Sequence, residues 1–306
     1  MTGPAPVTWT DAADGVRLAE RRWRPDGAAR GTVQLVHGLS EHAGRYERLA
    51  GALTARGLAV AALDQRGHGR TAESTGPGAF GQGATSDAVL DDVRDLGERL
   101  AAEHPGVPRF LLGHSLGSAV ALASAERDGA GLAGLVLSGP IGVAPRFAEA
   151  VPQLEAAVAG GLGDQPMDAL SGFNASFEPA RTPYDWLSRD PAEVDAYVAD
   201  PLCGDDVPPT YGYGAGMFAL VTRVASPEGV AGLPGGLPVL LLSGQRDPVG
   251  GEDAAQVTAL AELLRGRGLP VEQRVYPDAR HEVFNETNRD EVTADLLAWL
   301  EQRLAG

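Results

Sequence analysis

A serine between two glycines is the first candidate for chemistry in this chain of 306 residues. The stretch Gly113-His114-Ser115-Leu116-Gly117 fits Gly-x-Ser-x-Gly, a sharp turn that presents a nucleophilic serine. The pattern alone is weak evidence, because a chain with 41 Gly produces it by chance roughly 0.2 times. Its context is stronger, since a short apolar run before it reads as a strand and the small residues after it as a helix. We therefore predict that Ser115 is an exposed nucleophile rather than a simple helix cap.

A serine nucleophile needs a base, and the base needs an acid that orients it. When the serine follows a strand of a mostly parallel sheet, the three residues come in the chain order serine, acid, histidine. His281 is the only histidine after Ser115, so it is the predicted base. Asp247 ends the apolar run LPVLLLSGQRD and is the predicted acid. Two rivals are weaker: Asp278 lies three residues before His281 and is expected to cap a turn, and Asp253 to start a helix.

An oxyanion formed at Ser115 needs two N–H donors. The backbone N–H of Leu116 opens the helix after the nucleophile, where the positive end of the helix dipole lies. The second donor should come from the turn after an earlier strand. The backbone N–H of Leu39, in HGLSEH, is the candidate for that role.

The elements that must position these residues form an α/β pattern. Short apolar runs alternate with segments of helical period, which predicts a mostly parallel central sheet with helices on both faces. The early strand 16–25 has polar alternation and is expected at an antiparallel edge. The other predicted strands are 32–38, 58–64, 109–113, 132–140, 237–244 and VEQRVYP, and the clearest helices are 45–57 and 86–104.

The alternation stops after Pro140 and resumes near residue 226. We therefore expect a core in two parts, 1–140 and 226–306, that carries an inserted cap over 141–225. Within the cap only short helical patches are predicted. The stretch GDDVPPTYGYGAGM is polar and rich in glycine.

Composition excludes several classes of function. The net charge of −16 argues against nucleic-acid binding, and a chain without lysine excludes Schiff-base chemistry and Walker-type phosphate binding. The single cysteine, Cys203, fits a reducing compartment, so we expect a cytoplasmic protein. The sequence predicts neither a membrane span nor a signal peptide, and no metal or other cofactor.

Five motifs in order, HGLSEHAGRY, ALDQRGHGR, GHSLGS, SGQRDPV and ARHEVFNE, resemble the monoacylglycerol lipase and lysophospholipase branch of the α/β-hydrolases, often grouped with the S33 serine aminopeptidases. The resemblance runs from about residue 14 to 304. It implies the α/β-hydrolase fold, the same triad of Ser115, Asp247 and His281, and oxyanion donors at Leu39 and Leu116. It also implies hydrolysis of carboxylic esters.

The expected substrate is a monoacylglycerol-like or lysophospholipid-like ester with a short to medium acyl chain. Aminopeptidase or amidase activity on the same triad, and a non-catalytic binding protein, remain as alternatives. We expect at most transient contact of the cap with a membrane surface, and the sequence does not determine the oligomeric state. The candidates for the substrate pocket are His37, His114, Phe147, Phe173, Phe177 and Met217. For His37, turn packing is the preferred interpretation, and the cap aromatics can equally pack the cap onto the core.

Overall fold

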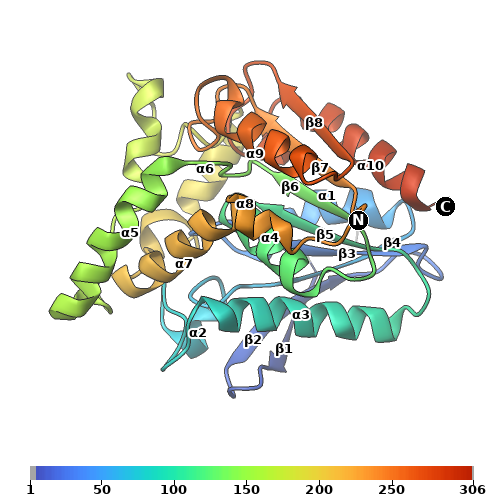
Figure 1. Cartoon of the computed structure of the whole chain (residues 1–306), viewed down its shortest axis with the longest axis horizontal. Helices are drawn as coiled ribbons and strands as arrows, with labels where there is room; N and C mark the ends of the chain where they lie inside the picture. The colour runs from blue at the N-terminus through green and yellow to red at the C-terminus, as the bar shows by residue number, and fades with distance from the viewer. Residues whose placement is uncertain (1–4, 305–306) are drawn as a thin grey trace.

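The computed structural model describes residues 5–304, in which eight strands form one sheet with helices on both faces (Figure 1). The strand order is β1-β2-β4-β3-β5-β6-β7-β8. β2 pairs antiparallel with β1 and with β4, and the other pairs are parallel, which confirms the predicted sheet type. The strands are Val7–Asp11 (β1), Arg17–Trp23 (β2), Gly31–Val36 (β3), Leu58–Leu63 (β4), Arg109–His114 (β5), Leu132–Ser138 (β6), Val239–Gly244 (β7) and Val271–Tyr276 (β8).

One prediction about the sheet edge was wrong. The strand expected there is β2, but β1 pairs along its outer side, from Val7 opposite Arg21 to Asp11 opposite Arg17. The sequence of β1, VTWTD, has the β-branched and aromatic residues that favour a strand. Because β1 pairs along the outer side of β2, β2 is half-buried and β1 is the exposed edge of the sheet.

Helices cover both faces of the sheet and bury its central strands. α1 (Glu47–Thr54) and α10 (Arg289–Leu304) pack on one face. α3 (Ser86–Glu103), α4 (Leu116–Asp128) and α9 (Ala255–Gly266) pack on the other. Every residue of β3, β4 and β7 is buried, as expected for parallel strands between two helical layers. No helix within 5–304 is both long and apolar enough to cross a membrane.

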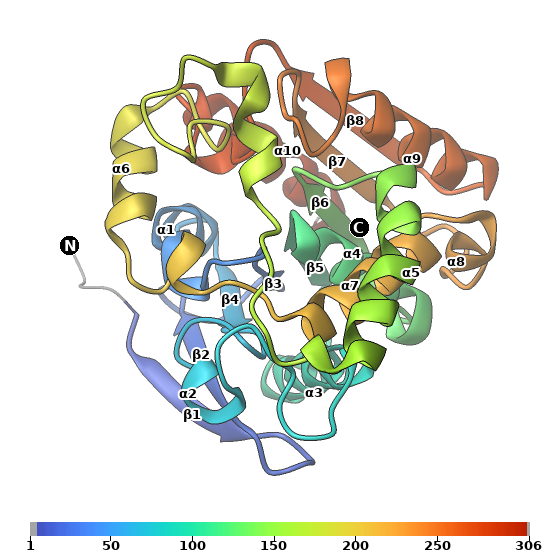
Figure 2. The same cartoon turned by 90° about the vertical axis from the view of Figure 1, so that its left-hand side faces the viewer.

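The residues between β6 and β7, 139–238, are called the cap segment below. Figure 2 shows α5 (Pro145–Ala157), α6 (Pro191–Ala199) and α7 (Tyr211–Val224) around the carboxyl ends of the central strands. The prediction of only short helical patches was wrong for α5 and α7, which have 13 and 14 residues. The division of the chain at 141 and 225 stays a prediction. The shorter elements of the chain are η1 (Ala43–Tyr46), α2 (Ala72–Thr75), η2 (Val158–Leu162), η3 (Ser171–Phe177), η4 (Gly204–Asp206), α8 (Pro227–Ala231), η5 (Glu252–Ala254) and η6 (Val283–Asn285).

The carboxyl edge of the sheet brings together segments far apart in sequence. Ser115 directly follows β5, and Leu39 lies three residues after β3. Asp247 and His281 follow β7 and β8 by three and five residues. Parallel strands end at the same edge, so the topology places all four in one region.

Candidate active site

Ser115 occupies a strained turn between β5 and α4. Its φ of 53° and ψ of −122° lie outside the regions that side-chain-bearing residues normally adopt. A Cβ on Gly113 would overlap the carbonyl of Gly117, and a Cβ on Gly117 would overlap the carbonyls of Val36 and His37. Both glycines are therefore required for this close approach, as the Gly-x-Ser-x-Gly pattern predicts.

His281 and Asp247 form a buried hydrogen-bonded pair. His281 Nδ1 donates to Asp247 Oδ2 at 2.9 Å, and Asp247 Oδ1 accepts from the Val249 amide at 2.8 Å. The residues are 2% and 1% exposed. Burial alone would lower the pKa of His281, but the charge and hydrogen bond of Asp247 outweigh it and raise that pKa above its usual value. Because Nδ1 carries the proton, Nε2 is left to accept one.

Two rings hold the imidazole of His281 in place. The ring centroid of His114 lies 4.8 Å away and that of Trp186, in the cap segment, lies 5.0 Å away. The Trp186 carbonyl also accepts from the His281 amide at 3.3 Å. Burial, followed by repulsion from a charged His281, lowers the pKa of His114 to about 4. A neutral His114 therefore packs beside the proposed base without adding charge.

The loop after β3 packs directly on Ser115. A Cβ on Gly38 would lie 3.1 Å from the Cβ of Ser115, so glycine permits this approach. Leu39 and Leu116 both line the cavity that contains Ser115. Leu116 begins α4, where the first amides have no intrahelical acceptor, and the Leu39 amide has no acceptor within residues 5–304. Both amides thus stay candidates for the predicted oxyanion donors.

The cap segment fixes that loop through Ser40, which has a φ of 53°. The Ser40 carbonyl accepts from the Tyr197 hydroxyl and from the Gly204 amide, each at 2.9 Å. In return, Ser40 Oγ donates to the Val207 carbonyl at 3.0 Å. The strained residue next to Leu39 is therefore held by three hydrogen bonds to the cap segment.

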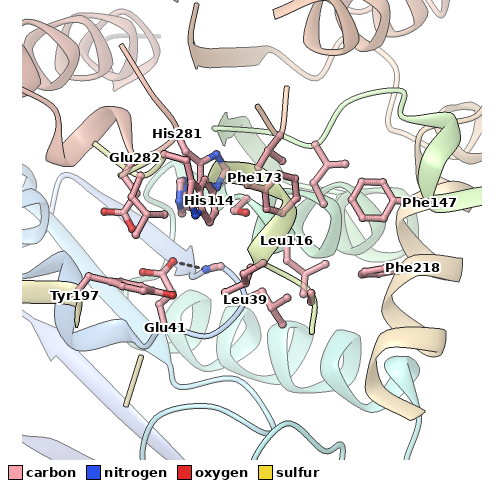
Figure 3. Close-up of a pocket in the computed structure, with 18 residues that line it drawn as sticks. Leu39, Glu41, His114, Leu116, Phe147, Phe173, Tyr197, Phe218, His281 and Glu282 are labelled. Carbon is pink, nitrogen blue, oxygen red and sulfur yellow. Dashed lines mark hydrogen bonds between the residues drawn. The ribbon is translucent and has the colours of Figure 1, made fainter. Parts of the chain in front are cut away.

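Ser115 and His281 line one cavity with two chemically distinct sides (Figure 3). Including its mouth, the cavity measures about 560 Å³. In the close-up, Glu41, Tyr197 and Glu282 lie on one side, and Phe147 and Phe218 on the other. The apolar part of the lining consists of Leu39, Leu116, Ile141, Phe147, Leu170, Phe173, Trp186, Leu187, Phe218 and Val249.

The polar side is built on a buried cluster of charges around Arg45. Arg45 binds Glu282 with both terminal nitrogens, at 2.5 and 2.8 Å, and Glu41 at 2.8 Å. The hydroxyl of Tyr46 donates to Glu41 at 2.7 Å, and the Gly38 amide donates to it at 2.5 Å. Burial alone would raise the pKa of Glu41, but the charge of Arg45 leads the opposing effects and lowers it to about 2. Sequence reasoning missed this cluster, although Glu41 and Arg45 have the spacing of a helical ion pair.

The structure brings three of the six predicted pocket residues to the cavity: His114, Phe147 and Phe173. His37, Phe177 and Met217 do not line it. His37 is fully buried in its turn, where Nε2 accepts from the Gln65 amide at 2.8 Å and Nδ1 donates to the Gly38 carbonyl at 2.8 Å.

Phe177 and Met217 have other partners. Phe177 lies beneath the guanidinium of Arg280, whose central carbon is 4.3 Å from the ring centre. Met217 is fully buried in α7, where the helix packs against α3, α4 and α5. Residue type alone suits both to an apolar pocket, but their packing places them outside it.

Three possible metal ligands lie near one another where the loop after β3 meets the cap segment. The ligand atoms of His42, Asp200 and Cys203 lie within 4.8 Å of one another. His42 Nδ1 accepts from the Gly44 amide at 3.1 Å, so the ring proton sits on Nε2 and is donated to Asp200 at 2.9 Å. A metal would need that nitrogen deprotonated. The group therefore fits a hydrogen-bonded contact between loop and cap segment better than a metal centre.

Comparison with known proteins identifies the family of this chain. The profile described as "Serine aminopeptidase, S33" matches residues 27–288. The chain belongs to this family. The predicted resemblance is therefore confirmed.

Two relatives cover nearly the whole chain. The monoacylglycerol lipase of Mycolicibacterium smegmatis is 34% identical over 95% of this chain and 95% of its own length. The monoglyceride lipase of Homo sapiens is 33% identical over 96% of this chain and 89% of its own. These relatives confirm the predicted class, a carboxylic ester hydrolase.

A solved structure agrees with the fold of this S33-family chain. A thermostable carboxyl esterase from Bacillus coagulans, in complex with glycerol, superposes with a TM-score of 0.91 at 29% identity, over 99% of this chain and 100% of that one. The predicted α/β-hydrolase fold is confirmed.

Proposed function

We propose that this chain is a serine ester hydrolase with Ser115 as nucleophile, His281 as base and Asp247 as the acid that orients the base. One observation carries the proposal. Ser115, in a turn that exposes its side chain, shares a cavity with His281, and His281 is hydrogen-bonded to Asp247. This is the constellation that activates a serine hydroxyl.

The mechanism follows from the protonation states. His281 Nε2 takes the proton of Ser115 as Oγ attacks the carbonyl carbon of the ester, and Asp247 stabilises the imidazolium that forms. The Leu39 and Leu116 amides bind the oxyanion. His281 then gives its proton to the leaving alcohol, which departs as the acyl-enzyme forms. Water, activated by His281, attacks the acyl-enzyme, and the carboxylic acid is released.

The two sides of the cavity support a substrate with one apolar and one hydroxylated end. The apolar lining suits an acyl chain of short to medium length. The carboxylates of Glu41 and Glu282 and the Tyr197 hydroxyl can accept hydrogen bonds from alcohol hydroxyls. The names of the relatives and the glycerol bound to the esterase neighbour agree with a monoacylglycerol-like ester. Contact with a membrane surface would be at most transient.

A second candidate, cleavage of an N-terminal amino acid, is favoured by the charge of the cluster. The carboxylates of Glu41 and Glu282 both form ion pairs with the single cation Arg45, so one negative charge remains in excess beside the cavity. An α-ammonium group could bind there. Four other acids of the cap segment do not line the cavity: Glu155, Asp164, Asp168 and Glu178.

Covalent labelling and a substrate panel test these proposals. An alkyl fluorophosphonate should modify Ser115 alone, and Ser115→Ala should lose both labelling and turnover while keeping its fold. Ser118→Ala, one turn along α4, is the matched control and should still be labelled. Labelling or esterase activity that survives in Ser115→Ala would refute the assignment.

The panel compares p-nitrophenyl esters of increasing chain length, monoacylglycerol, lysophospholipid, emulsified triglyceride and an aminoacyl nitroanilide. The highest kcat/KM should fall on short to medium esters and monoacylglycerol. Faster hydrolysis of triglyceride would contradict the substrate proposal, and preference for the nitroanilide would favour the second candidate.

A further inference from the structure

A second cavity lies on the other side of the molecule from the triad, between α3 and α4 and the amino-terminal halves of β3, β5 and β6. Including its mouth, it measures about 970 Å³, larger than the 560 Å³ of the catalytic cavity. The part of it open to a water-sized molecule is about 370 Å³, within the roughly 300–1,000 Å³ of typical ligand sites. The two cavities have no lining residue in common.

Small residues on the two helices leave this space open. Gly97 on α3 faces Gln34, where a Cβ would lie 2.9 Å from the side-chain oxygen of Gln34. Gln34 is held from β3 by a hydrogen bond from Nε2 to the Val93 carbonyl, at 2.7 Å. On α4, Ser124 lines the cavity together with Arg127 and Asp128. A larger side chain at Gly97 or Ser124 would occupy the cavity.

The hydroxyl of Ser124 is buried without a partner. Helical serine and threonine hydroxyls commonly donate to a carbonyl one turn earlier. Ser118 does so to Ser115 at 2.6 Å, and Thr222 to Phe218 at 2.9 Å. Ser124 is 5% exposed, and its Oγ has no hydrogen-bond partner within residues 5–304. Such a group gains from a ligand that accepts its proton.

Arginines surround the cavity in a chain of net charge −16. Arg94 and Arg127 both bind Asp91, at 2.8 and 3.0 Å. Arg109 differs from them, because its guanidinium donates to the Ala130 carbonyl at 3.1 Å and no carboxylate of the described chain lies within 4.0 Å of it. Its remaining N–H groups are suited to a carboxylate from outside.

The apolar part of the lining consists of Val93, Leu100, Phe110, Leu111 and Leu132. Thr32, Gln34, Glu98 and Asp128 also line the cavity, and Arg127 binds the carboxylate of Asp128 at 2.8 Å. A ligand that binds Arg109 and Ser124 and covers the apolar part of the lining has one anionic group and an alkyl chain.

We propose that this cavity binds an alkyl carboxylate, with its carboxylate on Arg109 and Ser124 and its chain against the apolar lining. A carboxylic acid with a short to medium alkyl chain is also the product of the proposed ester hydrolysis. The identification of the ligand as that product depends on the proposed function, but the binding does not. Hydrolysis by this chain would then place its own product in a site remote from the triad.

Binding of decanoate tests the proposal, using enzyme whose Ser115 carries a decyl phosphonate that fills the catalytic cavity. Mass spectrometry first checks that modification, so failure of the proposed nucleophile is seen separately. Isothermal titration should then find one decanoate per chain. Acetate, which lacks the alkyl chain, and 1-decanol, which lacks the charge, should each bind at least about tenfold more weakly.

Variants decide where decanoate binds. Arg109→Gln and Ser124→Leu should each weaken binding about tenfold or more. Ser124→Ala, which removes the hydroxyl without adding volume, should weaken it about threefold and remains informative if the leucine variant does not fold. Arg265→Gln is the matched control, because Arg265 also binds only a carbonyl, that of Val271 at 3.4 Å. Absence of decanoate binding, or binding unchanged in Arg109→Gln and Ser124→Ala, would overturn the proposal.

Discussion

Replacing Asp247 with asparagine should lower kcat and move the pH profile at the same time. The contact to be weakened is a charge-assisted hydrogen bond of 2.9 Å between two residues that are 2% exposed or less. Asparagine keeps the shape but removes the charge that stabilises the imidazolium of His281. In serine proteases the corresponding change lowers kcat by about 10⁴, and we expect a loss of about 10³–10⁴ here. That loss equals roughly 4–5.5 kcal/mol of transition-state stabilisation.

The direction in which the pH profile moves follows from the pKa of His281. His281 must be neutral to act as a base, so kcat/KM of the unmodified enzyme should fall as the pH drops through its raised pKa. In Asp247→Asn the charge and the charge-assisted bond are gone, and burial, which lowers the pKa of His281, remains. The acid limb should therefore move to lower pH while the plateau falls.

The assay is kcat/KM for a p-nitrophenyl ester as a function of pH. The matched control is Asp278→Asn, since Asp278 is exposed and precedes His281 by three residues. Its φ of 57° is tolerated by asparagine, so this variant should keep its rate and its acid limb. A lower plateau in Asp247→Asn with an unmoved acid limb would refute the proposed electrostatic coupling. A comparable loss in Asp278→Asn would refute the choice of acid.

Two further predictions concern the loop and the charge cluster. Tyr197→Phe removes the hydroxyl that donates to Ser40, so kcat should fall about threefold to tenfold. KM should rise as well, because the same hydroxyl faces the substrate cavity, and a change in KM alone would count against a role in positioning the loop. The pKa of Glu41 in the folded protein is about 2, below its ordinary 4.5, so its charge stabilises the fold above pH 4.5 and this contribution is lost as the pH falls toward 2. Glu41→Gln should therefore destabilise the protein by roughly 3 kcal/mol at pH 7 and by much less near pH 3, as measured by urea unfolding. A difference independent of pH would contradict that.

The sequence predicted the proposed catalytic residues because topology constrains them strongly. Residues that follow parallel strands meet at one edge, so the chain position of Asp247 and His281 already implied their proximity. A single histidine after Ser115 removed the choice of base. Leu39 and Leu116 were predicted by the same reasoning, and both line the cavity, because each lies close after the end of a parallel strand.

Packing between distant segments was not predictable in this way. The glycines of α7 argue against a helix by propensity, yet Gly214 and Gly216 allow close approach of Met167 and Phe80. The helix gains more from this packing than it loses in propensity. Met217 then faces the core, so an apolar residue in the cap segment did not become a pocket residue. Which of several aromatic side chains lines a cavity depends on such contacts, which one sequence does not encode locally.

The Arg45 cluster is better explained by positioning than by stability. Burying three charges costs desolvation free energy, and their mutual attraction often does no more than offset that cost. Apolar residues could therefore fill the same space without loss of stability. The partners of Arg45, however, come from two different parts of the site: Glu41 accepts from the Gly38 amide in the loop after β3, and Glu282 directly follows His281. One guanidinium therefore links the proposed oxyanion donor to the proposed base. An apolar cluster could fill the volume, but it could not set the direction of both loops by hydrogen bonds.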